Sequence, residues 1–308
     1  MSKSRSNTED VVTSTSTTTP REHIRNFARS TSIVFFGDKA GAGGQKMTVE
    51  DVLSNFHVRQ YCPWEIVPEG GSRFRAYIQS DHTPAAERMM LGLFTSREHA
   101  QSACAQQSPV VWLDEKLDEN RRCKLCQAGF ALLRRVHHCR NCGACVCAEC
   151  SSVSWPSRMV PPTYVHVGEK RVRVCDACHF FFERFRKSLL EGNIDEVVAT
   201  YSTGNCNLVC PFALYEGNHF PLHAAAQGGS LDVVKFLVEV ELVPLYFVRG
   251  GETVPYTTSS GMAVLALAAR EKAMDIVRYL VTERRVQMDQ VQDVKDLQDM
   301  CSWLLREV

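Results

Sequence analysis

The order of apolar and polar positions divides this 308-residue chain into segments of different character. Residues 1–32 are rich in Ser and Thr and poor in large apolar side chains, so they bury too little surface to offset their ordering entropy and are predicted to be disordered. Residues 47–108 alternate short apolar runs with turn-forming stretches, which predicts a small α+β unit. Its predicted strands span 61–67, 73–79 and 89–94, and Ser96 is placed to cap a helix over 96–107.

From Phe180 onward the chain begins with a predicted helix and then repeats one helical pattern. Three segments each place an aspartate ahead of an apolar pair on a short helix, at 192–198, 229–235 and 273–278. They resemble ankyrin repeats, which implies an all-α repeat region over 186–285 that binds an unidentified protein partner. An insertion, predicted at 243–258, lengthens the spacing between the second and third segments. The alternative is an irregular helical subdomain that only buries the helix preceding it.

Residues 286–308 predict a final helix with a single apolar stripe. The stripe consists of Val291, Val294, Cys301, Leu304, Leu305 and Val308 at three- and four-residue spacings. Such a stripe most often packs on the preceding repeat as a cap, and self-association into a homodimer is the alternative.

Cysteine spacing carries the clearest chemical signal in the chain. Eight of the fourteen cysteines form four Cys-x-x-Cys pairs. The pairs are Cys123/Cys126, Cys139/Cys142, Cys147/Cys150 and Cys175/Cys178. A two-residue spacer lets both thiolates face one Zn²⁺ ion about 2.3 Å away, and two pairs complete a tetrahedral site. Four pairs therefore predict two Zn²⁺ ions in closed structural sites, with Cys145 as a spare thiol that is also placed to substitute for Cys147.

Composition and charge indicate the cellular compartment of the protein and one class of partner that is not expected. The formal net charge is zero, so no overall field attracts nucleic acid. The N-terminus lacks the apolar core of a signal peptide, and the longest small-apolar stretch, 262–269, is far shorter than the roughly 18 residues of a membrane span. We therefore expect a cytoplasmic protein, in which clustered cysteine pairs bind metal rather than form disulfides.

The basic segment 135–143, Arg-Val-His-His-Cys-Arg-Asn-Cys-Gly, resembles the FYVE zinc-finger family. Trp112 ahead of it and Arg173-Val-Cys175 after it extend the resemblance over residues 112–182. The resemblance implies a cross-brace: Cys123, Cys126, Cys147 and Cys150 hold one zinc, and Cys139, Cys142, Cys175 and Cys178 hold the other. It also implies binding of phosphatidylinositol 3-phosphate at endosomal membranes and a role in membrane trafficking.

The headgroup residues that the resemblance implies lie beside the metal ligands. They are Arg135, His137, His138, Arg140, Arg173 and Glu115. Leu132 and Leu133 occupy the place of an exposed apolar tip that inserts into the membrane, the alternative being that they pack inward against Phe130. The chain departs from the family at Val136, where a second basic residue is usual, and at Glu115, where the family has aspartate.

Together these features predict a multidomain α+β protein: a small two-zinc finger, an ankyrin-like repeat region and a small N-terminal unit. We expect a non-enzymatic adaptor, because no hydrolase or transferase constellation is present and His223 is better explained as a turn hydrogen-bonding residue than as a base. The alternatives are an interaction scaffold that has lost lipid recognition and a RING-like ubiquitin ligase. Nucleic-acid binding is not expected, because the chain has no basic helix and no aromatic platform interleaved with cations.

Overall fold

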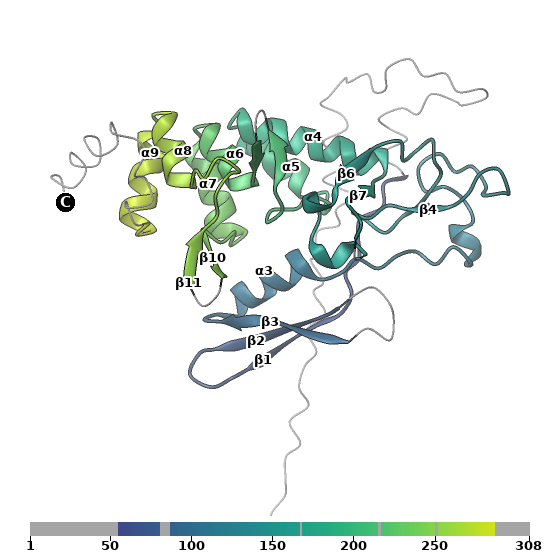
Figure 1. Ribbon diagram of the computed structural model, residues 1–308, viewed down its shortest axis with the longest axis horizontal. Helices are drawn as coiled ribbons and strands as arrows, with labels where there is room; N and C mark the ends of the chain where they lie inside the picture. The colour runs from purple at the N-terminus through teal and green to yellow at the C-terminus, as the bar shows by residue number, and fades with distance from the viewer. Residues whose placement is uncertain (1–54, 81–86, 167, 215–216, 250–251, 287–308) are drawn as a thin grey trace, which may run out of the picture.

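The computed structural model describes residues 55–80, 87–166, 168–214, 217–249 and 252–286 (Figure 1). The predictions of disorder at the N-terminus and of a helix over 286–308 lie outside these residues, apart from Val286, which is buried. Three parts follow one another along the chain: a sheet-and-helix unit, a cysteine-rich finger, and a stack of helix pairs (Figure 1).

The N-terminal unit is a three-stranded antiparallel meander covered on one face by a helix. Its elements are β1 (Trp64–Pro68), β2 (Phe74–Gln79), β3 (Arg88–Phe94) and α3 (Arg97–Gln107). The strand order is β1-β2-β3, with Trp64 opposite Ile78 and a register shift between Ala76 and Tyr77. A small core of its own joins Ala76 and Ile78 of β2 to Ala100 and Cys104 of α3. The three predicted strands and the predicted helix are confirmed, and Ser96 Oγ accepts from the backbone N–H of His99 at 3.2 Å as the N-cap.

The finger contains little regular structure. It consists of β4 (His137–His138) paired with β5 (Cys145–Val146), β6 (Ser154–Pro156) paired with β7 (Arg171–Arg173), and short 3₁₀ turns η1 (Asp118–Asn120), η2 (Ser157–Met159) and η3 (Pro162–Tyr164). Strands of two or three residues supply few ladder hydrogen bonds, so such a module needs another source of stability. Its buried residues include seven of the eight paired cysteines.

A single helix, α4 (Asp176–Leu190), runs from the finger into the repeats. It begins four residues before the predicted start at Phe180, because Cys175 serves as N-cap with its Sγ accepting from the backbone N–H of Cys178 at 3.5 Å. Its C-terminal half buries Phe185 and Leu189 against α5 and α6. The finger and the repeats consequently share one continuous hydrophobic core.

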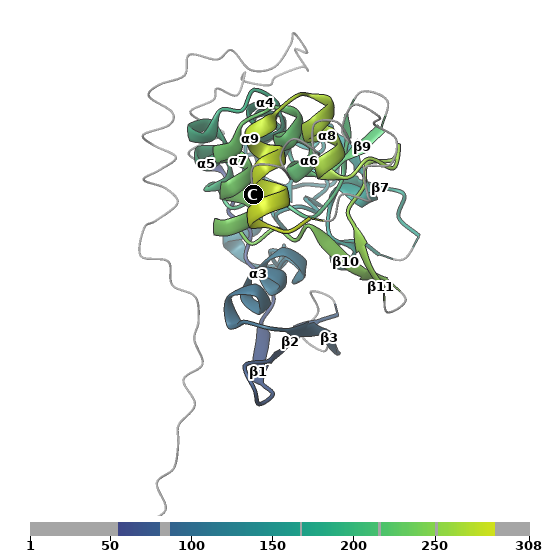
Figure 2. The same cartoon turned by 90° about the vertical axis from the view of Figure 1, so that its left-hand side faces the viewer.

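The repeat region stacks helix pairs beside one another (Figure 2). The pairs are α4 with α5 (Ile194–Tyr201), α6 (Pro221–Gln227) with α7 (Leu231–Lys235), and α8 (Val264–Arg270) with α9 (Met274–Arg278). Helices α7 and α9 continue into π-helical turns, η4 (Phe236–Val240) and η5 (Tyr279–Glu283). Two hairpins connect the pairs: β8 (Phe212–Leu214) with β9 (Gly217–His219), and β10 (Tyr246–Arg249) with β11 (Glu252–Pro255). The predicted insertion at 243–258 is the site of the β10–β11 hairpin.

Close packing of α4 against α6 depends on one glycine. A Cβ added at Gly228, just after α6, would lie 2.2 Å from the backbone oxygen of Leu189 near the end of α4. Only a residue without a side chain permits this approach. The alanines of α6 and α8 are likewise buried, and their small side chains let neighbouring helices pack closely.

The sheet unit is attached to the rest through α3, which lies between the sheet and the repeats in both views (Figures 1 and 2). Ser102 Oγ on α3 donates to the backbone oxygen of Glu241 at 2.9 Å, and Thr163 Oγ1 of the finger donates to the backbone oxygen of Gln107 at 2.6 Å. The N-terminal unit therefore contacts both other parts.

Candidate metal centres and the adjoining basic pocket

The first cysteine group joins two distant pairs. The thiols of Cys123, Cys126, Cys147 and Cys150 all lie within 4.8 Å of one another. Cys126 Sγ lies 3.8 Å from Cys147 Sγ, and the backbone N–H of Cys147 donates to Cys123 Sγ at 3.4 Å. Cys126 is exposed, whereas the other three are buried.

The second group is buried throughout. It contains Cys139 and Cys142 from the turn after β4, together with Cys175 and Cys178 at the start of α4, again within 4.8 Å of one another. Cys142 Sγ lies 3.9 Å from Cys175 Sγ, and the backbone N–H of Cys175 donates to Cys139 Sγ at 3.2 Å. The two groups interleave along the chain, which confirms the predicted cross-brace pairing.

Both groups have the dimensions of a tetrahedral zinc site. Bonds of about 2.3 Å to Zn²⁺ place the four sulfurs about 3.8 Å apart, as observed here. In the first group a hydrogen bond with Cys147 lowers the pKa of Cys123, while the same interaction raises the pKa of Cys147 to about 12. Four thiolates at this spacing are stable together only around a cation, so the donor set fits Zn²⁺. Backbone N–H groups aimed at Cys123 and Cys139 further stabilise the thiolate form.

Cys145 belongs to neither group, so the alternative that it replaces Cys147 is wrong. Its thiol donates to the backbone oxygen of Leu113 at 3.2 Å and lies 3.5 Å from His138 Nε2. Burial raises the pKa of Cys145 to about 11, and the nearby carboxylates of Glu115 and Asp114 add to the shift. Cys145 is therefore an uncharged packing residue.

An aromatic and basic cluster lies beside the second metal centre. The guanidinium of Arg140 lies over the ring of Trp112 at 4.4 Å, and the ring of His138 stacks on Trp112 at 5.1 Å. His138 Nε2 is 2.9 Å from the backbone oxygen of Leu113. These contacts fix Arg140 and His138 before any ligand arrives.

Other predicted headgroup residues surround this cluster. The backbone N–H of Arg140 donates to the backbone oxygen of Arg173 at 2.9 Å, which brings the two arginines side by side. Burial lowers the pKa of His137, and the positive charges of Arg173 and Arg135 lower it further. Arg135 is exposed, whereas Arg173 also donates to the backbone oxygen of Ser151 at 2.8 Å. The backbone bond between Arg140 and Arg173 and the electrostatic interactions of His137 thus bring four basic residues together: Arg135, His137, Arg140 and Arg173.

The two positions that depart from the family do not enter the cluster in the same way. Glu115 is exposed at the Cys145 side of the finger, and Asp114 Oδ1 accepts from the backbone N–H of Lys116 at 2.9 Å. Val136 is half-buried between Arg135 and His137. Neither position places a further cation beside Arg140.

Leu132 and Leu133 form the tip of a tight turn. The backbone groups of Ala131 and Arg134 exchange two hydrogen bonds of 3.0 Å, which leaves the two leucines as the central residues. Their relative exposures are 89% and 98%. The alternative that they pack inward is wrong, because Phe130 packs against the core without them.

The acidic partner of Arg140 could not be predicted from the sequence. Glu169, in the turn before β7, accepts from Arg140 Nη2 through Oε1 at 3.0 Å and from the backbone N–H of His166 through Oε2 at 3.1 Å. The position of Glu169 in the sequence does not predict this contact, because only a turn of the folded chain brings Glu169 to Arg140.

A buried polar network also joins the second metal centre to the repeats. Asn141 Nδ2 donates to the backbone oxygen of Asn205 at 2.8 Å, and Asn205 Nδ2 lies 3.4 Å from Cys178 Sγ. Arg59 donates through its backbone N–H to Asn205 Oδ1 at 3.0 Å. The Arg59 side chain is buried and donates to Asn207 Oδ1 and to the backbone oxygen of Cys206 at 2.6 Å, so it ties the N-terminal unit to the same loop.

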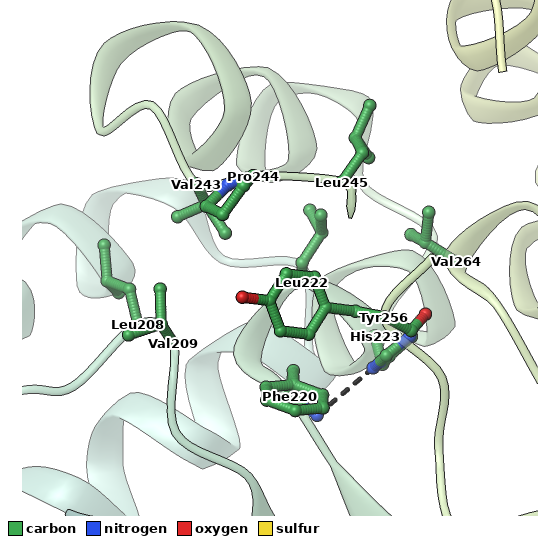
Figure 3. A pocket seen from close by; sticks show the side chains of 10 residues that line it. All are labelled: Leu208, Val209, Phe220, Leu222, His223, Val243, Pro244, Leu245, Tyr256 and Val264. Atoms are coloured by element: carbon green, nitrogen blue, oxygen red, sulfur yellow. Dashed lines mark hydrogen bonds between the residues drawn. The ribbon is translucent and has the colours of Figure 1, made fainter. Parts of the chain in front are cut away.

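An apolar pocket lies in the repeat region, with an empty volume of about 290 Å³ that includes open solvent (Figure 3). Phe220 and Tyr256 line it together with leucine and valine side chains. His223 accepts from the backbone N–H of Phe220 through Nδ1 at 3.2 Å, so its Nε2 donates to the backbone oxygen of Tyr256 at 3.1 Å. Burial lowers the pKa of His223 to about 4. The prediction that His223 bonds a turn is confirmed.

Comparison with known proteins agrees with this geometry. Residues 111–184 match the FYVE zinc finger family, and residues 189–292 match ankyrin repeats in three copies. Over 70 residues the chain is 46% identical to RUN and FYVE domain-containing protein 2 of Homo sapiens and of Pongo abelii, and over 69 residues it is 44% identical to RUN and FYVE domain-containing protein 1 of Homo sapiens. The matched segments are 23% and 22% of this chain, and they span only 10% and 8% of the relatives. In the described residues, no helix has the length and apolar character of a membrane span.

Proposed function

Because the chain carries a FYVE zinc finger that binds two zinc ions, followed by ankyrin repeats, we propose that it is a non-enzymatic adaptor at endosomal membranes. In this proposal the finger binds phosphatidylinositol 3-phosphate and the repeats bind a protein partner. The observation that carries the proposal is the fixed position of Arg140 over Trp112, beside a zinc centre and on the same finger as the exposed Leu132–Leu133 turn.

A phosphomonoester is the ligand that best suits the basic cluster. Its charge of about −1.5 to −2 and its acceptor oxygens favour arginine, whose planar guanidinium donates two parallel hydrogen bonds. Arg140 and Arg173 are joined through their backbones, and Arg135 and His137 lie close by. The 14 Lys and Arg against 8 Asp and Glu in residues 112–187 give +6, which eight thiolates and two Zn²⁺ reduce to +2. Recognition therefore depends on placement more than on overall charge.

The exposed leucines supply the second part of membrane affinity. Inserting one leucine into the bilayer contributes about 1.5–3 kcal/mol, and thus about 3–6 kcal/mol for the pair. Micromolar binding requires about 8 kcal/mol. The remainder must come from the headgroup or from a second copy, so headgroup recognition and insertion are both needed for stable attachment.

The repeats support the second part of the proposal. Stacked helix pairs present an extended surface made of equivalent positions from successive units, a geometry suited to binding proteins. Here β9 and the β10–β11 hairpin lie to one side of the helix pairs (Figure 2). Because α4 belongs to both the finger and the first pair, a partner on the repeats would be held at a fixed orientation to the membrane.

A second candidate function is a protein-interaction scaffold without lipid recognition. The observation that favours it is the ion pair between Arg140 and Glu169, together with the loss of a cation at Val136. A charge-assisted hydrogen bond of this kind contributes about 1.5–3 kcal/mol, so its absence weakens a headgroup site considerably.

Vesicle sedimentation separates the two functions. The zinc-loaded full chain is mixed with phosphatidylcholine vesicles that contain either phosphatidylinositol 3-phosphate or phosphatidylinositol. We expect sedimentation only with the 3-phosphate, and its loss in Arg140→Ala. Arg121→Ala, which removes an exposed cation of the same finger, should bind like the unmodified protein. If the chain sediments no better with phosphatidylinositol 3-phosphate vesicles than with phosphatidylinositol vesicles, the result would favour the scaffold without lipid recognition.

A further inference from the structure

We propose that Glu169 is a built-in competitor for the phosphate ligand, so that lipid binding requires its carboxylate to leave Arg140. The inference rests on the proposed lipid-binding function and concerns the regulation of that same site. It follows from two contacts of Arg140: the ion pair with Glu169, which must open, and the contact with Trp112, which holds the guanidinium in place.

Glu169 occupies the position that a ligand phosphate would need. Its Oε1 accepts from Arg140 Nη2 at 3.0 Å, and its Oε2 accepts from the backbone N–H of His166 at 3.1 Å. The backbone N–H of Glu169 in turn donates to the backbone oxygen of His166 at 3.2 Å, which closes a turn. Both carboxylate oxygens are therefore in use, one of them on the arginine.

Arg140 is held in place by contacts other than this ion pair. Its guanidinium lies over Trp112 at 4.4 Å, and its backbone is bonded to Arg173. Its Nε is buried and has no hydrogen-bond partner in the described part of the chain. If Glu169 moved away, Arg140 would keep its position and its Nη2 would become available to a ligand. The carboxylate is thus the movable member of the pair.

The environment keeps Glu169 ionised and the pair closed. Burial opposes ionisation of Glu169, but the hydrogen bonds from Arg140 and from the backbone of His166, together with the positive charge of Arg140, outweigh it, so the pKa of the carboxyl group lies below its usual value. The side chains of Arg140 and Glu169 are only 18% and 27% exposed, which limits screening by solvent. A ligand that must first open such a pair binds with an affinity reduced by the fraction of open molecules.

Competition through the Arg140–Glu169 ion pair can be distinguished from general electrostatic repulsion between the finger and the membrane. A carboxylate elsewhere on the finger repels an anionic membrane through space, whereas Glu169 acts through one guanidinium. Removing its charge should therefore strengthen lipid binding only while Arg140 is present. Glu119 provides the comparison, because it is an exposed carboxylate of the same finger in η1 and makes no contact with Arg140.

The experiment is a titration of the zinc-loaded full chain with vesicles containing phosphatidylinositol 3-phosphate. The proteins are the unmodified chain, Glu169→Gln, Glu119→Gln, Arg140→Lys and the double variant Arg140→Lys with Glu169→Gln. Glutamine retains an oxygen to accept from His166, so the turn should persist. Two zinc ions per chain and an unchanged melting temperature verify folding.

We expect Glu169→Gln to bind about three- to tenfold more tightly, Glu119→Gln to change little, and the gain from Glu169→Gln to shrink in the Arg140→Lys background. If Glu169→Gln binds no more tightly while Arg140→Lys weakens binding, the competitor role is wrong and the proposed function stands. A gain equal to that of Glu119→Gln would also overturn it, because bulk charge would then explain the effect. If neither the unmodified chain nor Glu169→Gln binds these vesicles, the proposed function and this inference are both wrong.

Discussion

Asn141, between two zinc ligands, donates through its side-chain Nδ2 to the backbone oxygen of Asn205 in the loop after α5, at 2.8 Å. Asn205 in turn approaches the ligand Cys178 at 3.4 Å. Both asparagines are buried. The loop that leaves the first helix pair is thus tied to the metal centre, in addition to the connection through α4. Finger and repeats form one structural unit, and several measurable consequences follow from it.

Zinc removal should unfold the repeats together with the finger. Structural zinc in such modules stabilises the fold by about 10–16 kcal/mol, and α4 starts at two ligands. We expect Cys142→Ser to lose helical circular dichroism over the whole described fold, not only in the finger. Cys145→Ser, which alters a cysteine outside both groups, should retain two zinc ions and a normal spectrum. Full helicity in zinc-free Cys142→Ser would show that the repeats fold independently.

Asn141→Ala should destabilise the protein by about 1–3 kcal/mol, because it leaves the backbone oxygen of the buried Asn205 without its donor and removes the bond that the Asn207 amide donates to Asn141 Oδ1. Urea denaturation followed by circular dichroism measures the change. The transition should remain single, since both parts depend on this junction. Separate transitions for finger and repeats would contradict the shared unit.

Gly228→Ala should be more damaging than Gly229→Ala. At Gly228 the added Cβ meets the Leu189 backbone oxygen at 2.2 Å, which forces α4 and α6 apart and costs about 2–4 kcal/mol. At Gly229 the added Cβ has no atom within 4 Å, so only the strain of φ +71° remains, about 1 kcal/mol. Thermal melts of the two variants show which has the lower melting temperature. A lower value for Gly229→Ala would mean that α4 and α6 adjust to the Cβ added at Gly228.

His223 should make stability depend on pH. Its pKa of about 4 lies below the 6.5 of an unfolded histidine, so the unfolded chain binds more protons between these values. The stabilisation of the folded state by neutral His223 is therefore fully present above pH 6.5. As the pH falls toward 4, this contribution to the free energy of unfolding is lost, and it amounts to about 3 kcal/mol. His223→Gln should lack this component, so the stability difference between it and the unmodified chain should narrow on acidification. An unchanging difference from pH 7 to pH 4.5 would contradict the buried neutral imidazole.

The leucine turn should affect membranes but not folding. Both side chains are almost fully exposed, so Leu132→Ala with Leu133→Ala should leave the melting temperature unchanged. Loss of insertion should weaken vesicle binding at least tenfold, because each leucine contributes more than about 1.4 kcal/mol. Leu117→Ala on the same finger, half-exposed, is the control. Weakening by Leu117→Ala to the same extent would indicate general apolar adhesion.

Local spacing predicted much of this molecule. Four Cys-x-x-Cys pairs predicted two metal centres, and the aspartate-led segments predicted α5, α7 and α9. The start of α4 was placed too late, because a cysteine ligand acting as N-cap is not a usual capping residue. Glu169 and Asn205 could not be found at all. Their contacts join positions 29 and 64 residues apart, and they arise only when turns and repeats are packed together.

The central claim is that Arg140 binds the phosphomonoester of the lipid headgroup. The most direct test is nuclear magnetic resonance of the Arg140 Nε–H group, assigned by its absence in Arg140→Lys, during titration with soluble inositol 1,3-bisphosphate. We expect a saturating shift of this resonance and no shift of the Arg121 resonance. Saturation of other resonances with Arg140 unmoved would contradict it, because the ligand would then bind elsewhere.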